Sequence, residues 1–288
     1  MPSRPRNLAD RVHRARAREQ IRFIDLTERM ALKLSAIPEY TARVHFGVWH
    51  RLVGRMPDFE HLRGVFTPLV YVELEATDIR LDPRQALQVE GESVLARALD
   101  SAGATRYLLR EGRHTVRDGA GTVVARARLI NVFTRYDPDP ARRRVTTLPP
   151  ELGLGPGPTR VAELPGLDAL VPAHRDPDFV EHETHTWHYG QTDPNRHVNG
   201  MEYLRVMETF VADVLATRGH DLRRLAFARA RIVYRKPCFR GEGFRRVAWL
   251  QGEAEPVVTG AFLKPDDPPG SRPAAAIELG LVQHDAPA

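Results

Sequence analysis

The sequence predicts an α+β protein made of two halves with the same plan. In each half a helix-like segment precedes several strand-like runs joined by short turns, which is typical of antiparallel sheets. A stretch rich in proline and glycine, 137–179, separates the halves. With 288 residues the chain is long enough for two domains that each bury a core. We therefore expect a first domain over 37–136, a linker over 137–179 and a second domain over 180–288.

The N-terminal segment, 1–36, is basic and is expected to be helical. Its apolar residues recur at close to helical spacing, which predicts an amphipathic helix over 5–35; they are Leu8, Val12, Ile21, Ile24, Met30 and Leu34. The next segment, PEYTARVHFGVWHRLVGR (38–55), continues as an apolar helix whose buried stripe contains Val44, Val48 and Leu52.

Strand-like runs complete both halves. In the first half they cover 66–81, 86–99, 105–117 and 121–136, separated by turn signals such as DPR, DSAGA and DGAG. In the second half a strand over 180–191 precedes a helix that begins near Val198. Four further strands are expected over 225–236, 244–253, 256–265 and 275–284.

Composition limits the classes of function. The single cysteine, Cys238, excludes an internal disulfide and a CxxC metal site, which fits a cytoplasmic protein. No run of 18 apolar residues is present, so we expect no membrane span. The net charge is +5, but no basic run alternates with aromatic residues, and nucleic-acid binding is not expected. His182, His185 and His188 cannot share one face of a strand, so no metal site is predicted.

The segment YGQTDPNRHVNGMEYLRVMETF (189–210) is the strongest candidate site. If 191–197 is extended, Asp193, Asn195 and His197 project to one side. A carboxylate, an amide and an imidazole could serve as base or nucleophile, as carbonyl ligand and as proton carrier in acyl chemistry. Glu208 lies three helical turns beyond His197, on nearly the same face. Alternatively, Asp and Asn are common helix caps and turn formers, and the segment could simply begin a helix.

The start of that helix offers a second chemical element. Backbone N–H groups at a helix N-terminus, here Val198, Asn199 and Gly200, can stabilise an oxyanion, and a glycine permits close approach of a substrate. Tyr203 follows on the helix, while Trp187 and Tyr189 are expected to share one strand face that lines the core or an acyl pocket.

The motif DPNRHVNGMEYL resembles the hotdog-fold signature, and D-x-N-x-H-V-N is similar to the catalytic segment of acyl-ACP thioesterases. A second resemblance is VYRKPCFRGE (233–242), which is similar to the Y-R-x-E-C stretch of that family. The resemblance implies a tandem (double) hotdog with long central helices wrapped by antiparallel sheets. It also implies that Asp193, Asn195 and His197 are catalytic, that Cys238 occupies the family's cysteine position, and that the first hotdog supplies the acyl pocket.

One departure from the family pattern is Pro237, which stands where the family has a glutamate. Either Glu208 or Glu242 takes over its role, or hydrolysis is weak, or the protein is a non-catalytic module that binds an acyl chain or its carrier. Cys238 without a base beside it is more often a small buried hydrophobe than a nucleophile.

The same residues also resemble tandem-hotdog dehydratases of polyketide and fatty-acid synthases. Asp193-x-x-x-His197 matches their D-x-x-x-H, and HLRGVFTPLVYVELEA (61–76) is similar to their H-x-x-x-G-x-x-x-x-P segment with two spacings one residue short. In this alternative His61 takes an α-proton from a 3-hydroxyacyl thioester, and Asp193 protonates the leaving hydroxyl.

The resemblances imply an acyl thioester carried on acyl carrier protein or coenzyme A, with no further cofactor because the substrate carries phosphopantetheine. Arg196, Arg235 and Arg240 could meet an acidic carrier or a phosphate, or could be solvated surface charge. A tandem chain already contains a hotdog pair, so both a monomer and a homodimer are compatible with the sequence.

Overall fold

The computed structural model describes residues 8–53, 65–135, 137, 139–148, 150, 154–155, 157–172, 174–193, 196–252 and 256–284. The first half contains helix α1 (Ile37–Val53) and strands β1 (His13–Gln20), β2 (Val65–Phe66), β3 (Leu69–Ala76), β4 (Ala86–Leu99), β5 (Thr105–Arg117), β6 (Val123–Val132) and β7 (Thr134–Arg135). The second half contains β8 (Phe179–Val180), β9 (His185–Thr186), helix α2 (Gly200–Thr217), β10 (Leu225–Tyr234), β11 (Gly243–Gln251), β12 (Val257–Leu263) and β13 (Ala275–Gln283). Short 3-10 turns connect several of these elements.

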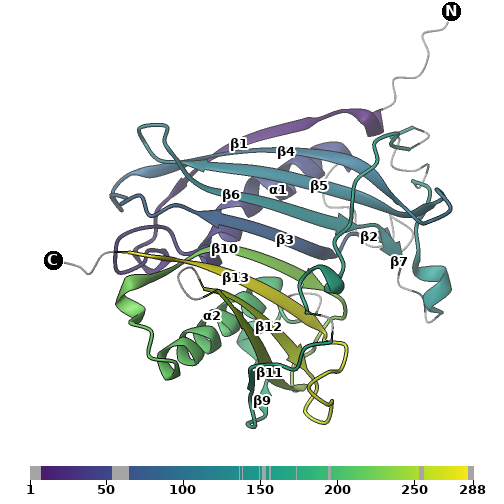
Figure 1. The fold of residues 1–288 in the computed structure, drawn as a ribbon. Helices are drawn as coiled ribbons and strands as arrows, with labels where there is room; N and C mark the ends of the chain where they lie inside the picture. The colour runs from purple at the N-terminus through teal and green to yellow at the C-terminus, as the bar shows by residue number, and fades with distance from the viewer. Residues whose placement is uncertain are drawn as a thin grey trace, which may run out of the picture.

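One antiparallel sheet runs through both halves (Figure 1). Its strand order is β1-β4-β5-β6-β3-β10-β13-β12-β11-β8, with β9 paired to β11. The halves join where β3 pairs with β10, from Glu75 opposite Arg229 to Tyr71 opposite Val233. Apart from the one over 180–191, the expected antiparallel strands of both halves are therefore present. The long strands form a single surface, and β2 and β7 pair in a separate two-stranded sheet.

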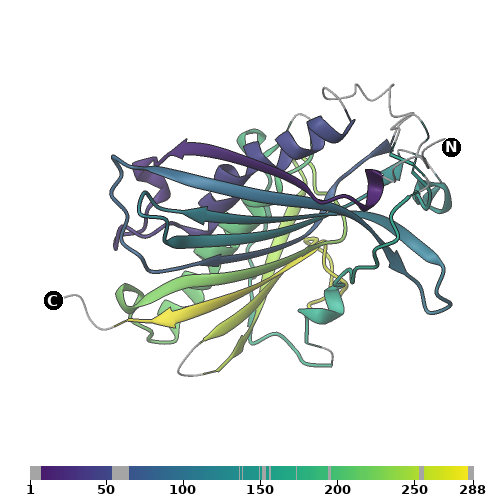
Figure 2. The ribbon, with the colours of Figure 1, turned by 90° about the horizontal axis from the view of Figure 1, so that it is seen from above.

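Both helices pack against the same face of this sheet. α1 contacts β1, β4, β5 and β6, and α2 contacts β12 and β13. Ile37, Tyr40 and Val44 of α1 and Leu204, Met207 and Val211 of α2 belong to one core cluster. The helices have 17 and 18 residues, and Figure 2 shows the sheet curving around them from one side. The expected long central helices are therefore not confirmed among the described residues. No helix among the described residues is both long and apolar enough to cross a membrane.

The linker does more than connect the halves. Leu167 and Leu170, in and beside the 3-10 turn Leu167–Ala169, are buried against Leu109, Ile130 and Trp249 on the opposite face of the sheet. Among its described residues the linker contains the 3-10 turns Pro140–Arg143 and Leu167–Ala169 but no α-helix.

The helix expected over 5–35 is wrong. Residues 13–20 form β1, which pairs with β4 from His13 opposite Ser93 to Gln20 opposite Ala86. In HRARAREQ the exposed side chains alternate with half-buried ones, and this period of two favours a strand over a helix. The segment is thus the edge strand of the first half.

The strand expected over 180–191 is largely wrong as well. Only Phe179–Val180 and His185–Thr186 pair with β11, and Tyr189–Gln191 is a 3-10 turn. The side chain of His188 accepts a hydrogen bond from a backbone N–H of this turn, while Gln191 Oε1 accepts from His188 N–H at 2.8 Å. These side-chain to backbone bonds compete with strand pairing.

On the face of the sheet opposite the helices, several of the many arginines form ion pairs between neighbouring strands. Opposite charges stand on neighbouring strands in the pairs Arg14–Glu92, Arg16–Glu90, Arg126–Glu75, Arg128–Glu73 and Arg231–Glu278. Cross-strand pairs of this kind are each worth about 0.2–1 kcal/mol. The arginines in these pairs therefore have carboxylate partners within the sheet.

Candidate active site

Asp193 and His197 close a tight turn in front of α2. The backbone N–H of Asp193 donates to the carbonyl of His197 at 2.9 Å, and the N–H of His197 donates to Asp193 Oδ1 at 3.3 Å. Arg196 has a φ of 63°, in the left-handed region that L-residues rarely adopt. The segment is therefore not extended, and the expected alternation of side chains along 191–197 is wrong for the described residues. Asn195 lies outside them.

Two neighbouring segments hold this turn in place. Val198 N–H donates to the Cys238 carbonyl at 2.8 Å, and His197 forms an isolated bridge with Phe239. On the other side Asn199 N–H donates to the Gln191 carbonyl at 2.8 Å. The ring of His197 meets that of Phe239 edge-on at 5.0 Å. The two sequence motifs, DPNRHVN and YRKPC, are thus brought together, as their joint resemblance to one family required.

Helix α2 begins directly after the turn, close to where the sequence predicted it. The side chain of Asn199 caps it by accepting from Met201 N–H at 3.0 Å. Tyr234 on β10 donates its hydroxyl to the Gly200 carbonyl at 2.7 Å. A Cβ at Gly200 would lie 3.1 Å from that hydroxyl oxygen and 3.7 Å from Leu69 on β3. The glycine therefore lets strands of both halves approach the helix N-terminus.

The interior beside the turn is aromatic. Trp187, only 1% exposed, stacks on Phe244 at 4.2 Å and contacts Tyr203 at 4.9 Å, and Phe262 completes the cluster. Tyr189 is 75% exposed, so it does not share a face with Trp187 and the expected common lining is wrong. The reason is the 3-10 turn, which breaks the alternation between residues 187 and 189.

Cys238 lies between this cluster and the turn. Its backbone N–H donates to Tyr203 Oη at 3.1 Å, and its side chain is buried. Burial raises the pKa of the thiol above its ordinary value. It also raises the pKa of the Tyr203 hydroxyl. At neutral pH both groups are therefore protonated, and the surroundings of Cys238 are those of a core residue.

The two candidate replacements for the family glutamate lie apart. Glu242 Oε2 accepts from Phe239 N–H at 3.0 Å, which closes the turn after Cys238. Glu208 instead contacts Ser35 in the 3-10 turn Leu34–Ala36, and burial raises the pKa of its carboxyl to about 7. Glu242 is therefore linked to the Asp193–His197 turn, because it bonds Phe239 and Phe239 pairs with His197. Glu208 instead contacts the first half of the chain at Ser35. His61, the dehydratase candidate, lies outside the described residues.

The three arginines expected to meet a carrier differ in their surroundings. Arg196 is exposed in the turn itself, and Arg240 lies over the exposed ring of Tyr189 at 5.7 Å. Arg235 donates to the carbonyls of Pro273 and Arg272 at 2.6 and 2.7 Å. Arg196 and Arg240 therefore border the site with exposed charge, while Arg235 fastens the loop before β13.

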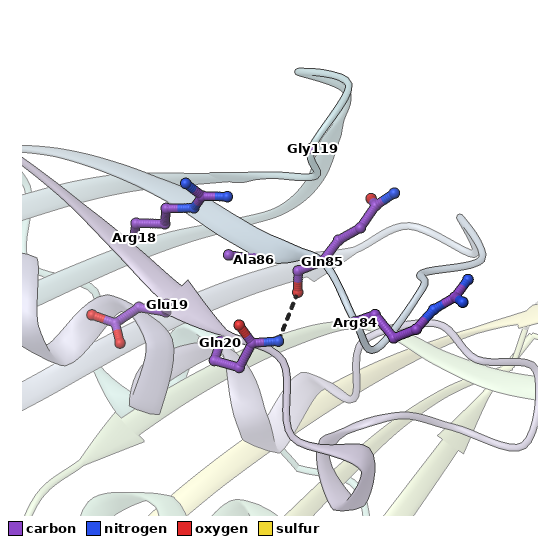
Figure 3. A pocket seen from close by; sticks show the side chains of 7 residues that line it. All are labelled: Arg18, Glu19, Gln20, Arg84, Gln85, Ala86 and Gly119. Atoms are coloured by element: carbon purple, nitrogen blue, oxygen red, sulfur yellow. Dashed lines mark hydrogen bonds between the residues drawn. The ribbon is translucent and has the colours of Figure 1, made fainter.

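A polar hollow elsewhere on the surface does not coincide with this site. It has a volume of about 490 Å³ and lies at the end of β1, between Gln20, Arg84 and Gly119 (Figure 3). Arg84 is paired with Asp82 at 2.7 Å.

Among the described residues no group of three or more histidine, cysteine or acidic side chains could hold a metal ion. His185, one of the three histidines that were considered as metal ligands, forms a hydrogen bond with Glu181 at 2.8 Å.

Sequence reasoning missed a buried polar cluster in the first half. His45 on α1 contacts His114 on β5 at 3.2 Å and Asn131 on β6 at 3.1 Å, and all three are at most 7% exposed. Arg110 on β5, 1% exposed, donates to the His45 carbonyl at 2.6 Å. The signal was available, because Arg110, Gly112 and His114 occupy alternate positions on the inward face of a predicted strand.

Comparison with known proteins supports the fold. No protein-family model and no curated protein sequence matches the chain. Solved structures do match. A 12:0-ACP thioesterase from Umbellularia californica has a TM-score of 0.65 and 15% identity, with 94% of this chain and 97% of that chain covered. An acyl-ACP thioesterase from Bacteroides thetaiotaomicron has a TM-score of 0.63 and 12% identity, over 93% and 97%.

A protein from Lactobacillus plantarum, assigned as an oleoyl thioesterase, has a TM-score of 0.66 and 14% identity, with coverage of 96% and 97%. At these identities the likeness concerns the fold alone. The chain therefore has the tandem hotdog fold of these thioesterases along nearly its whole length, as the two motifs implied.

Proposed function

We propose that the protein hydrolyses an acyl thioester carried by acyl carrier protein or coenzyme A, in fatty-acid or polyketide-type metabolism. The observation that carries this proposal is the Asp193–His197 turn at the N-terminus of α2. It places a carboxylate with a fixed orientation and an imidazole on one short loop, next to the backbone of Gly200. Acyl transfer needs a base, a proton carrier and oxyanion donors near one point.

In the proposed reaction Asp193 activates the attacking water or attacks the thioester carbonyl itself. His197 carries the proton to the leaving thiolate, and Asn195 polarises the carbonyl or holds the water. The N–H of Gly200 at the start of α2 stabilises the oxyanion, because the N–H groups of Val198 and Asn199 already donate to the carbonyls of Cys238 and Gln191. Asn199 contributes as the helix cap, since its side chain accepts from the Met201 N–H and so fixes the start of the helix. The pantetheine arm enters along the exposed side, where Arg196 and Arg240 face its phosphate or an acidic carrier.

The test is release of free thiol from octanoyl-CoA and octanoyl-carrier protein, with intact-mass analysis of the acyl product. Asp193→Asn should lower kcat/KM by at least about a hundredfold. Asp213→Asn, an exposed carboxylate on α2, is the matched control and should keep the wild-type rate.

A 3-hydroxyacyl thioester that loses one water with its thioester intact would point to dehydration instead. Binding of these thioesters without turnover would favour the non-catalytic module.

Pro237 offers a second test of the same proposal. It is exposed and directly precedes Cys238, at the position where the related motif has a glutamate. A carboxylate installed there by Pro237→Glu should raise kcat about tenfold or more if it acts as a general base. Pro237→Gln is the control for shape without charge. Equal rates in both variants would show that a carboxylate at this position has no catalytic use here.

A further inference from the structure

Among the described residues, Arg110 is a buried cation without an acidic partner. It donates to the His45 carbonyl at 2.6 Å and to Ser93 Oγ at 3.3 Å, and its guanidinium lies 5.1 Å from the Trp49 ring. No acidic side chain of the described residues forms an ion pair with it. Burial alone lowers its pKa, to about 9. Because an unpaired buried charge is costly, such a group calls for a function or a ligand.

The side chains around Arg110 are also incompletely satisfied. His45 bonds His114 and Asn131, and Asn131 Nδ2 donates to the Thr67 carbonyl at 2.9 Å. The Nδ1 atom of His114, a residue only 3% exposed, has no hydrogen-bond partner among the described residues. Because Asn131 Oδ1 accepts from His45 Nε2–H, His45 Nδ1 accepts from His114 Nε2–H, and the unpaired Nδ1 of His114 is an acceptor. The cluster thus combines a positive charge without a carboxylate partner with an unpaired acceptor nitrogen, both inside the first half.

The sheet connects this cluster to the proposed active site. Arg110 stands opposite Asn131, and Asn131 stands opposite Leu69. Leu69 in turn lies 3.7 Å from the position of a Cβ at Gly200, at the start of α2. Two strand spacings of about 4.8 Å place Arg110 about 10 Å from Leu69. A medium-length acyl chain spans that distance, since each carbon–carbon bond is about 1.5 Å long.

We propose that Arg110, held in its cluster with His45, His114 and Asn131, binds a carboxylate at the far end of the acyl group, so that the substrates are medium-chain ω-carboxyacyl thioesters. This inference rests on the proposed hydrolysis for the thioester end of the substrate. A carboxylate supplies the counter-charge that Arg110 lacks and accepts from the guanidinium N–H groups that the His45 carbonyl and Ser93 do not use. A plain alkyl chain supplies neither, and a hydroxyl or keto group supplies only the acceptor.

The experiment has a binding arm and a turnover arm. Calorimetry compares suberate with octanoate, two free acids of equal length that differ in the distal carboxylate. Thiol release compares the corresponding mono-thioester of suberate with the octanoyl thioester. Wild type should bind suberate, and hydrolyse its thioester, about ten- to a hundredfold better. Arg110→Met should abolish both preferences, and Arg106→Met, an exposed arginine on the same strand, should keep them.

Equal binding of the two acids by wild type, or a preference for octanoate, would overturn the inference without needing any variant. So would a preference that persists in folded Arg110→Met. If that variant does not fold, Arg110→Lys keeps the charge and should retain part of the preference, whereas Arg110→Gln should lose it. Tight suberate binding without hydrolysis of either thioester would support the carboxylate site at Arg110 and contradict the proposed hydrolysis. Failure of the carboxylate site and failure of the proposed hydrolysis therefore give different results.

Discussion

Asp193 and His197 bond to each other through their backbones and through one carboxylate oxygen, so that the two residues define a single closed turn. The Asp193 carboxylate, which we propose to be catalytic, is thereby oriented before substrate arrives. Preorganisation of this kind is a large part of how enzymes lower barriers. The turn also forces Arg196, between them, into the left-handed region at a φ of 63°.

Arg196→Gly should separate the strain of this turn from its charge. Glycine adopts positive φ without penalty, and the left-handed region costs other residues about 1 kcal/mol. We expect the variant to be as stable as wild type or up to about 1 kcal/mol more stable in denaturant unfolding. Its KM for a CoA thioester should rise severalfold if Arg196 meets the phosphate. Arg196→Ala is the control, because it loses the charge and keeps the strain; an unchanged KM in both would exclude phosphate binding by Arg196.

Cys238→Ala should leave hydrolysis within about threefold of the wild-type rate. Burial raises the pKa of this thiol, so little thiolate exists at neutral pH and the group is a poor nucleophile. The expected loss is one of stability, about 1 kcal/mol. Iodoacetamide should modify the native protein much more slowly than free glutathione. Complete inactivation of a folded Cys238→Ala protein would instead make the cysteine part of the chemistry.

Glu208 should make the protein less stable as pH rises. Burial raises its pKa to about 7 in the folded state, against about 4.3 in an unfolded chain. Between these values the folded protein binds the extra proton, and the associated stability is lost as pH rises through 7. We therefore compare the unfolding free energies of Glu208→Gln and wild type at two pH values. Going from pH 5 to pH 8 should shift their difference by about 1–2 kcal/mol in favour of the variant. Exposed Glu28→Gln is the control for an ordinary surface carboxyl.

The histidine pair should produce the opposite dependence at low pH. Burial, aided by the charge of Arg110, lowers the pKa of His114 to about 4 and lowers that of His45 well below its usual value. An unfolded histidine takes up its proton near pH 6.5, so stability present above that pH is lost as pH falls toward 4. In the Glu208→Gln background, which removes the opposing titration of Glu208, the unfolding free energies at pH 7.5 and 5 should differ by about 2 kcal/mol or more, with a smaller difference when His114→Gln is added. An identical difference in that variant would place the titrating group elsewhere.

Most of the fold could be predicted because strand and helix periods are local properties. The runs that became β4, β5, β12 and β13 are bounded by turn residues, and α2 begins within two residues of the expected start. The errors at 13–20 and 180–191 have local causes too. In HRARAREQ the alternation of small and charged residues outweighs a sparse helical spacing, and beside His188 side-chain bonds to the backbone replace strand pairing.

The site was predictable as a set of motifs but not as a geometry. The convergence of Asp193, His197 and Cys238 depends on pairing between segments some forty residues apart, which spacing alone does not encode. The partners of Arg110 come from α1, β4 and β6, so its lack of a carboxylate is visible only once the sheet is assembled. A single arginine on the inward face of a predicted strand is nevertheless a warning that the interior is not purely apolar.

Strand β1 ends the sheet on one side, and its sequence has a consequence for the behaviour of the protein in solution. An exposed edge offers unpaired backbone groups to any passing strand, which is a route to aggregation. Here three arginines, Arg14, Arg16 and Arg18, point outward along that edge, and two of them are fixed by Glu92 and Glu90. Another strand could add to this edge only by bringing its own residues beside these charged side chains, of which Arg14 and Arg16 already have carboxylate partners. The arginines of β1, which also contribute to the positive charge of the chain, thus disfavour the pairing of another strand with the open edge of this long continuous sheet.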